Sequence, residues 1–524
     1  MRSDIFLRIY KHLSQHIFLY CIIAFSAWLF FFRLDWLPLT SWDEAWYGSI
    51  AREMYRTGNM RDLMFNGKHF FDHPPFGFIL LSTMYKLFGI SVFSTRALNA
   101  FLGVLSSIFL YATAVRLYKK KAIGFAAAII LNTCVWYVIR VRSGNLDAPF
   151  IFFYIFSLYS AMRTKSSIAW FVPTMISFGL LIMTKTLVGV SAIVPIVWFM
   201  FPIFFKKQSV LKVLTFLIAG LVAWGVIVLP WYFYHLHTYP GFYEFHFVRI
   251  GSRGALAKDH LGQFLRLNWQ LPLFYLHMGV RKWYKVWVGS SVVIIIHILV
   301  LAQKQIKSWF SSKHSKKSFD KNCTSILHAD TGLVLWNLVI LYPFLTTDQT
   351  QIWHLIPVYV PLALITARIT YFCLKIVKSI TDRYTKHLTK TYVKISKNYF
   401  WDGIYMLFFI GIALLQIKTF YYEVFPTSHY VPNETAIAQY AKQLPNARIL
   451  ADLDFFPIVS FYADKEVVIY NRLETPEKTV EEAFAQAPDA IMMVKNDILD
   501  QYLKTHQDIA VIKRNDSFSL ISKK

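Results

Sequence analysis

The chain has 524 residues, of which 56% are hydrophobic, 18% aromatic and only 16% charged. A soluble globular domain carries about 25% charged residues, so this composition excludes an ordinary soluble enzyme and indicates a membrane protein with several spans. The net charge of +25 is also typical of nucleic-acid binding. However, the basic residues stand in short segments between apolar runs, as in the cytoplasmic loops of membrane proteins. We therefore expect membrane lipids as partners and no nucleic acid.

The N-terminal segment combines positive charge with an apolar run. Arg2, Arg8 and Lys11 precede a run over residues 17–32, which is longer than the apolar region of a cleaved signal peptide and has no small-residue cleavage site. We therefore expect an uncleaved first span. The cysteines have no paired or metal-site spacing, so no disulfide framework is predicted; they are Cys21, Cys134, Cys323 and Cys373.

Apolar runs of similar length recur as far as residue 419. The sequence predicts about eleven spans, near residues 16–34, 92–118, 122–139, 148–162, 168–183, 187–205, 212–231, 286–302, 331–346, 355–376 and 400–419. Lys-rich connections at 303–321 and 375–397 mark the cytoplasmic side. The loops 35–91 and 232–285 then lie on the external side, and an odd number of spans places the C-terminal part there too.

The last hundred residues contain more acids, shorter apolar runs and more turn residues. Their pattern predicts four short strands and one helix, at 447–452, 466–470, 489–494, 510–514 and 475–486 respectively. The predicted fold class is therefore an all-α polytopic membrane domain over residues 1–424, followed by a small external α/β domain over residues 425–524.

An acid-rich stretch separates the first two long apolar segments. Acids are sparse elsewhere in the first four hundred residues, whereas the stretch 40–75 carries Asp43, Glu44, Glu53, Asp62 and Asp72. Ser41 and Glu44 have capping-box spacing, which predicts a helix that starts at Trp42. The helix should end near Thr57, with Gly58 in the left-handed conformation. A folded, acidic loop beside a membrane helix indicates chemistry at the membrane surface.

The second half of this stretch contains two turn signals. Asn66-Gly67 between short apolar runs predicts a tight hairpin. Asp72-His73-Pro74-Pro75 predicts a rigid, extended exit from the loop, because proline fixes its own φ and disfavours helix in the residue before it.

These features, in this order, resemble the first external loop of the GT-C membrane glycosyltransferases. The greatest similarity is to the dolichyl-phosphate-mannose protein mannosyltransferases and the bacterial aminoarabinose transferases. Their Asp-Glu-Ala-x-Tyr helix, Asn-Gly turn and acid-Lys-Pro-Pro exit match residues 43–47, 66–67 and 72–75, with His73 where the family usually has lysine. The resemblance covers roughly residues 15–375. It implies the GT-C fold and transfer of a sugar from a polyprenyl-phosphate donor.

Asp43 is the candidate catalytic residue, because the resemblance matches it to the catalytic aspartate of the family. Glycosyl transfer needs a carboxylate that accepts the proton of the acceptor or stabilises positive charge developing on the sugar. The alternative is that Asp43 only favours a helix N-terminus electrostatically. Tyr47 belongs to the same motif and is a candidate substrate-binding residue. Glu44 is interpreted as structural, since it occupies the capping-box position.

Asp72 and His73 form a second polar point of the loop. In relatives the acid and lysine at these positions contribute to the site, and in some the acid helps to hold a metal. A divalent cation is therefore one option here, although no cofactor is firmly predicted. Histidine can donate to a phosphate, bind a metal or lie at the interface without a chemical role, so the departure from lysine leaves the role of His73 open.

Two further candidates lie at the external ends of later spans. Asp147 stands where the family has an external acid, but an N-cap residue before the next helix is an equal explanation. Lys185 resembles the lysine of the family's Thr-Lys-Gly turn, which can meet the donor phosphate. The alternative is a snorkelling side chain that keeps its charge in water.

The last two candidates are Arg249 and His354. Arg249 ends an aromatic run and matches a family arginine, but Ile250-Gly251 replace the acid and polar residue that often follow. That departure weakens a metal-site inference. Further along, Thr350 replaces a family lysine and His354 a family tyrosine. A purely structural role is the alternative for His354.

Together these observations predict a membrane glycosyltransferase that uses a polyprenyl-phosphate sugar donor at the external, periplasmic face. The acceptor is left open between a glycolipid, a protein and a polymer. The chain has no Gly-rich P-loop, in keeping with a family that needs no nucleotide at this step. Two alternatives are a transporter or flippase for lipid-linked sugars, which would need ionisable residues near the bilayer midplane, and an inactive receptor that binds through its C-terminal domain.

Overall fold

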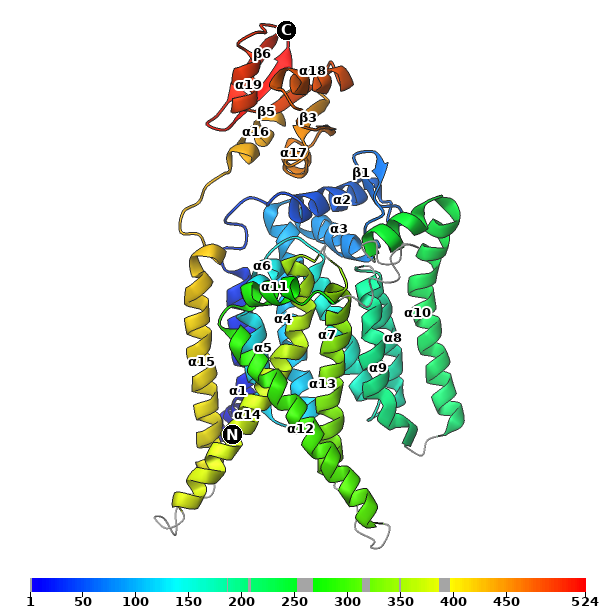
Figure 1. Cartoon of the computed structure of the whole chain (residues 1–524), viewed down its shortest axis with the longest axis vertical. Coiled ribbons are helices and arrows are strands. Elements are labelled where there is room, and N and C mark those ends of the chain that lie inside the picture. The colour runs from blue at the N-terminus through cyan, green and yellow to red at the C-terminus, as the bar shows by residue number, and fades with distance from the viewer. Residues whose placement is uncertain are drawn as a thin grey trace.

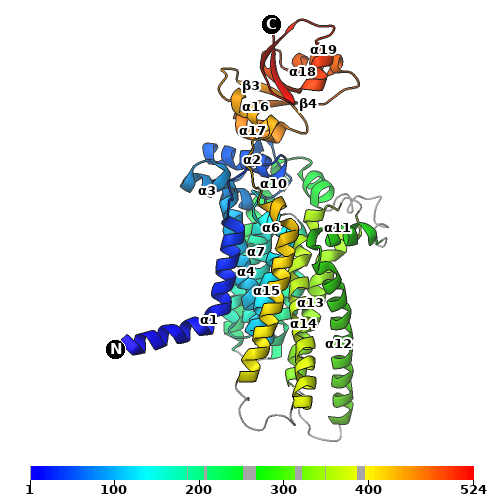
Figure 2. The ribbon, with the colours of Figure 1, turned by 90° about the vertical axis from the view of Figure 1, so that its left-hand side faces the viewer.

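The computed structural model describes residues 2–185, 187–205, 209–251, 267–312, 321–347, 350–385 and 396–524. Long helices form a bundle, and a small domain with a β-sheet stands above one end of it (Figures 1 and 2). The N-terminus lies toward the opposite end of the bundle from the C-terminus (Figure 1). The predicted fold class of a helical membrane domain followed by a small α/β domain is therefore confirmed, whereas the exact boundary at residue 424 and the external position of the second domain remain predictions.

The bundle is built from α1 and from all helices between residues 92 and 424. Their bounds are α1 (Arg2–Phe31), α4 (Val92–Tyr118), α5 (Lys121–Asn132), α6 (Val135–Val141), α7 (Asp147–Arg163), α8 (Phe171–Ile182), α9 (Ile193–Met200), α10 (Val210–Thr238), α11 (Gln270–Val280), α12 (Trp283–Ser312), α13 (Lys321–Leu345), α14 (Ile356–Thr385) and α15 (Ser396–Val424). Short helical turns complete it: η1 (Ile168–Trp170), η2 (Leu187–Ala192), η3 (Phe201–Phe205), η4 (Glu244–Gly251) and η6 (Ile352–Leu355). The predicted 232–285 loop thus begins inside α10.

The predicted number of about eleven spans is not confirmed. Among the described residues, six helices are long and apolar enough to cross a membrane: α4, α10, α12, α13, α14 and α15. A seventh span is counted if α5 and α6, which meet at an angle of 76°, form one broken span. The other apolar segments found among the described residues, such as His16–Phe31 within α1 and Phe76–Phe88, are shorter than the roughly 18 residues of a full crossing. Parts of the two predicted cytoplasmic connections, 313–320 and 386–395, lie outside the described residues.

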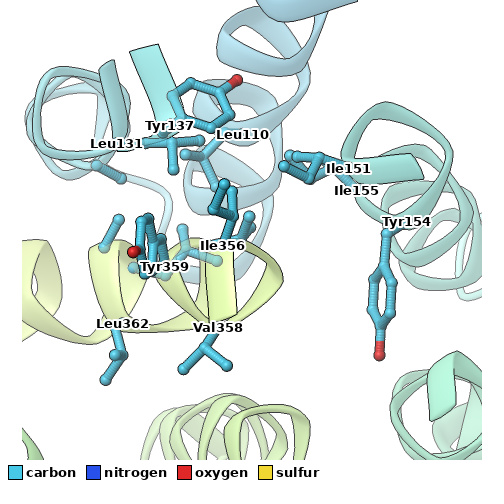
Figure 3. Packing of buried hydrophobic residues seen from close by; sticks show 14 of the residues in the cluster. Leu110, Leu131, Tyr137, Ile151, Tyr154, Ile155, Ile356, Val358, Tyr359 and Leu362 are labelled. Atoms are coloured by element: carbon cyan, nitrogen blue, oxygen red, sulfur yellow. The ribbon is translucent and has the colours of Figure 1, made fainter. Parts of the chain in front are cut away.

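The core of the bundle is formed where α4, α5, α6, α7 and α14 meet. Figure 3 shows Leu110, Leu131, Tyr137, Ile155 and Tyr359 converging there, and all five are fully buried. The helix pair α4–α5 packs closely because α5 is rich in alanine and glycine: a Cβ on Gly124 would lie 2.8 Å from a backbone oxygen of α4. Small residues at such contacts let two membrane helices approach.

Two helices lie across the top of the bundle, beneath the sheet domain: α2 (Asp43–Thr57) and α3 (Phe76–Phe88) (Figure 1). The C-terminal end of α2 is as predicted, since Gly58 has a φ of 70° and its N–H donates to a carbonyl of the last turn. The predicted capping box is wrong. Trp42 is the N-cap, with no side-chain cap, and the Ser41 hydroxyl donates to the Asp454 carbonyl instead.

The predicted hairpin follows α2. Strands β1 (Met64–Phe65) and β2 (Lys68–His69) pair antiparallel around Asn66 and Gly67, whose φ angles are 53° and 73°. Positive φ at both turn residues is what a two-residue hairpin turn of this type requires. This prediction is confirmed.

The C-terminal domain contains one five-stranded sheet in the order β4-β3-β5-β7-β6. The four predicted strands are β3 (Arg448–Asp452), β4 (Glu466–Tyr470), β5 (Ile491–Lys495) and β6 (Ile509–Arg514), and the predicted helix is α18 (Pro476–Gln486). The sequence patterns did not indicate β7 (Phe518–Lys523), α16 (Asn433–Ala441), α17 (Phe456–Ala463) or α19 (Asn496–Tyr502). Here α17 faces α2 (Figure 2).

Candidate active site

The Glu44 side chain fixes the N-terminus of α2 on the bundle. Its carboxylate pairs with Arg96 of α4 through Nε and Nη2, at 2.5 and 2.8 Å, and accepts hydrogen bonds from the backbone N–H groups of Thr40 and Gly144. Burial alone would raise the pKa of Glu44, but Arg96 and these donors hold it below its usual value. The structure thus supports a structural role for Glu44. It also places the side chain of Asp43, one residue earlier, on a different side of the helix.

Asp43 is the first member of a chain of charged side chains. Its Oδ2 lies 2.6 Å from Nη2 of Arg140 in α6, and Nε of the same arginine lies 2.5 Å from Oδ2 of Asp147 at the start of α7. The other oxygen of Asp147 contacts Nζ of Lys185, just beyond α8. The Asn145 side chain fixes the intervening turn by bonding the Arg140 carbonyl and the Asp147 N–H. Four charges from four parts of the chain are therefore brought together.

The solvent exposure of these four charged side chains differs from Asp43 to Asp147. The Asp147 side chain is only 5% exposed, whereas that of Asp43 is 29% exposed. Asp43 therefore presents an accessible carboxylate, while Asp147 holds the two cations from behind.

The loop that leaves α2 supplies a second group. The Tyr47 hydroxyl lies 3.0 Å from Nε2 of His73. Burial, and then the negative charges of Asp43 and Asp72, raise the pKa of Tyr47. Burial raises the pKa of Asp72 to about 6. The positive charge of Arg249 lowers this pKa, and the negative charge of Asp43 raises it. The Tyr47–His73 contact thus joins the exit loop to α2, and the charges of Arg249 and Asp43 both act on the Asp72 carboxyl.

The titration of Asp72 makes a testable difference to stability. Folding raises its pKa from 3.8 to about 6, so the neutral carboxyl favours the folded state. This contribution is present below about pH 4 and is lost as the pH rises through 6. Asp72→Asn should therefore melt like the wild type at pH 4 and roughly 1–3 °C higher at pH 8.

Thermal unfolding in detergent across this pH range measures the effect. Asp35→Asn, at an exposed position after α1, is the control. A melting difference for Asp72→Asn that does not change with pH would contradict the expected burial of the Asp72 carboxyl.

The geometry argues against the N-cap alternative for Asp147 and the snorkelling alternative for Lys185. Asp147 is not an N-cap residue: Leu146 holds that position, and the Asp147 carboxylate is engaged with Arg140 and Lys185. Lys185 does not simply snorkel, since its ammonium is directed at Asp147 and its side chain is 19% exposed. Whether either residue binds substrate stays a prediction.

Arg249 and His354 are placed differently from the other candidates. Arg249 is exposed on η4, where its guanidinium lies 5.3 Å from the Phe245 ring, and it reaches the site through its charge. His354 is buried against Phe344, and its Nδ1 accepts from the backbone N–H of Gln351. Its neighbour in η6, Trp353, packs over Arg140: the guanidinium carbon of Arg140 lies 5.7 Å from the centre of the Trp353 ring.

Three residues of the site were not among the sequence candidates: Arg96, Arg140 and Trp353. Arg140 carries a usable signal, because a charged residue in an otherwise apolar helical segment needs a partner. Arg96 and Trp353 could not be predicted in this way. Their contacts, with Glu44 and Arg140 respectively, join segments that are far apart in the sequence.

The site is electrostatically balanced by acids and cations that alternate around it. They are Asp43, Asp72, Asp147, Arg140, Lys185 and Arg249. Such a site can accept a proton at an exposed carboxylate and meet an anionic group with its cations. Within the described ranges, no three His, Cys, Asp or Glu side chains are grouped so as to hold a metal ion.

Comparison with known proteins gives partial sequence matches. Residues 72–233 match the family model described as dolichyl-phosphate-mannose-protein mannosyltransferase. The chain is 24% identical over 338 residues to an undecaprenyl phosphate-alpha-4-amino-4-deoxy-L-arabinose arabinosyl transferase of Pseudomonas fluorescens, covering 63% of this chain and 54% of that protein. It is 27% identical over 161 residues to an uncharacterized protein of Aquifex aeolicus, covering 30% and 32%. The chain thus spans between a third and about half the length of these relatives.

The structural matches extend over nearly the whole chain. A crystal structure of ArnT from Cupriavidus metallidurans bound to undecaprenyl phosphate has a TM-score of 0.61 at 16% identity and covers 97% of this chain and 98% of that one. The archaeal oligosaccharyltransferase AglB from Archaeoglobus fulgidus has a TM-score of 0.54 at 12% identity and covers 93% and 70%. The chain therefore has the fold of the GT-C membrane glycosyltransferases, and its residues 72–233 carry the mannosyltransferase family pattern.

Proposed function

We propose that this protein transfers a sugar from a polyprenyl-phosphate donor to an acceptor, with Asp43 as the catalytic residue. The observation that carries the proposal is the partly exposed Asp43 carboxylate at the end of the Arg140–Asp147–Lys185 chain. It is supported by the fold shared with an ArnT that binds undecaprenyl phosphate. The curated relatives that transfer aminoarabinose from undecaprenyl phosphate add further support.

In this reaction an acceptor oxygen forms a bond to the anomeric carbon of the sugar. The bond from that carbon to the phosphate oxygen breaks, and polyprenyl phosphate leaves with the electron pair. Asp43 takes the proton of the acceptor or stabilises the positive charge that develops on the sugar. Lys185 and Arg249 meet the phosphate, whose charge increases as it leaves. Arg140 orients the Asp43 carboxylate through its second contact with Asp147.

The proposed location is a bacterial inner or cell membrane, with the site on the external, periplasmic side. The site and the sheet domain lie at the end of the bundle opposite the N-terminus (Figure 1). The basic residues of the long connections after α12 and α14 favour the cytoplasm for that other end. The acceptor would then be a glycolipid, a protein or a polymer of the cell envelope.

The proposal can be tested in cells. Glycans and glycolipids of a deletion strain, complemented with the wild type or with Asp43→Asn, are compared by mass spectrometry. We expect one sugar to be lost from one class of molecule in the deletion strain and restored only by the wild type. An unchanged glycan and glycolipid profile, with normal expression of the protein in the wild type, would contradict the proposal.

Donor binding gives a second test. If Lys185 meets the donor phosphate, Lys185→Gln should raise the KM for the polyprenyl-phosphate sugar about tenfold or more, since one charge-assisted contact contributes about 1.5–3 kcal/mol. Lys68→Gln removes an exposed lysine from β2 and is the matched control. An unchanged KM in a folded Lys185→Gln variant would show that Lys185 only forms the ion pair with Asp147 and does not bind the donor phosphate.

The transporter alternative rests on a second charged group inside the bundle. Asp330 of α13 is fully buried and contacts Tyr118 (2.8 Å), His297 (3.0 Å) and Arg368 (3.6 Å). The sparse acids of the first four hundred residues thus include one inside the bundle, outside the stretch 40–75. Because α4, α12 and α14 each supply a partner to Asp330, the group fits a polar tie between helices. If the purified protein moved a lipid-linked sugar across the membrane of vesicles that contain no acceptor, transport would be favoured instead.

A further inference from the structure

Helix α2 shares a hydrophobic core with the C-terminal domain. Ala45 and Ala51 of α2 belong to the same buried cluster as Phe456 and Phe461 of α17. Helix α2 approaches α17 so closely that a Cβ on Gly48 would lie 3.0 Å from the Phe461 ring. The helix that carries Asp43 is therefore packed between the bundle and the domain (Figure 1).

Charged contacts reinforce this packing at the C-terminal half of α2. Arg56 makes two hydrogen bonds of 2.7 Å to the Asp464 carboxylate, which follows α17 directly. Arg52, one turn earlier, lies 3.1 Å from the same carboxylate and donates to the carbonyls of Ser460 and Phe461 at 2.8 Å. One acid of the domain thus receives two arginines of the candidate catalytic helix.

Two clefts border the ion pair. One, of about 630 Å³, is lined by Arg52, Arg56 and Asp464 together with Asn66 and Lys465, and the other, of about 340 Å³, by the same three residues together with Ser91 and Lys442. Arg52, Arg56 and Asp464 line both clefts, so their ion pair is the charged contact between α2 and the domain in this part of the seam. It adds a direction-specific restraint on α2 to the apolar packing with α17.

A further contact fastens the loop that follows α2. The Asn66 side-chain amide donates to the Val467 carbonyl of β4, and its oxygen accepts from the Val467 N–H at 2.9 Å. The hairpin follows the C-terminus of α2. Before the N-terminus of the helix, the Ser41 hydroxyl donates to the Asp454 carbonyl. The domain therefore contacts the segments on both sides of α2.

We propose that the C-terminal domain positions the active site, with Asp464 as the positioning residue that holds Arg52 and Arg56 and thereby the angle of α2. This inference rests on the proposed function of Asp43. Asp464 does not touch the reacting atoms. Its effect reaches them because Asp43 and Tyr47 belong to the same rigid helix.

The test is Asp464→Asn in the full-length protein. Asp464 has a φ of 56°, and asparagine tolerates this left-handed conformation as well as aspartate. The substitution therefore removes the charge without straining the backbone. We expect kcat to fall about tenfold, because a small misplacement of a catalytic group has a large effect on rate. The KM for the donor should stay within about twofold, since Lys185 and Arg249 are not on α2.

A matched control lies in the same domain. Arg514 makes two hydrogen bonds of 2.7 Å to Asp500, and neither residue belongs to the seam with α2. Asp500→Asn should leave kcat unchanged. If Asp464→Asn does not fold, Arg56→Gln removes the more exposed partner and should give a smaller loss in kcat alone.

The outcomes separate the inference from the function on which it rests. Absence of sugar transfer by the wild type contradicts the proposed function. Transfer by the wild type with equal kcat in Asp464→Asn and Asp500→Asn overturns the positioning role, and so does an Asp464→Asn effect confined to donor KM.

Discussion

Asp43→Asn is expected to lower turnover by about 10²–10⁴ while insertion, expression and donor binding stay near normal. The amide keeps the shape of the side chain and can still accept a hydrogen bond from Arg140. It cannot accept a proton or stabilise positive charge as a carboxylate does. If Asp43 only favoured the N-terminus of α2, the change would reduce stability by about 0.3–1 kcal/mol and leave turnover nearly intact.

A membrane assay with a labelled lipid donor distinguishes these results, which differ by orders of magnitude. Glu53→Gln removes another acid from α2, away from Arg140, and is the matched control. Near-wild-type transfer by Asp43→Asn would remove Asp43 from the catalytic role.

Arg140→Lys should give the second large effect, a fall in turnover of about 10²-fold. The guanidinium contacts Asp43 through Nη2 and Asp147 through Nε at the same time. Lysine keeps the positive charge but is a single, flexible point charge, so it cannot hold two carboxylates in this fixed geometry. The Asp43 carboxylate would lose its orientation although its chemistry is intact.

The comparison variant for this prediction is Arg142→Lys. Arg142 lies two residues later and donates to the carbonyls of Leu29 and Phe30, which an ammonium can also do. Turnover should be measured alongside melting temperature, so that loss of orientation is distinguished from loss of fold. Equal turnover in the two variants would show that bridging by Arg140 does not matter for the reaction.

Local chemistry made the stretch 40–75 interpretable from the sequence. The left-handed Gly58 and the Asn66-Gly67 hairpin depend on the conformational range of single residues and on contacts a few positions apart. Helix α18 could be predicted for the same reason, because its N-cap Thr475 accepts from the N–H three residues later. The Asp43–Tyr47 motif and the apolar composition likewise indicated a glycosyltransferase in a membrane before any contact was known.

Where local signals competed with distant partners, the sequence was misleading. Capping-box spacing predicted that Glu44 would pair with Ser41, but Glu44 binds Arg96, 52 residues away, because a buried carboxylate gains more from a guanidinium than from a single N–H. The number of about eleven spans stays a prediction, since hydropathy measures apolar length alone and the described helices include short ones such as α9 and the bent pair α5–α6.

The sequence by itself determined the membrane class of the protein and the limits of its loop elements, because these depend on composition and near neighbours, whereas Asp43 became a candidate through the resemblance of its motif to the glycosyltransferase family. Only the tertiary structure decided how the site is assembled. Arg140 lies 97 residues from Asp43, and Asp464 lies 408 residues from Arg56. Ion pairs over such distances exist only after the bundle and the C-terminal domain have packed around α2.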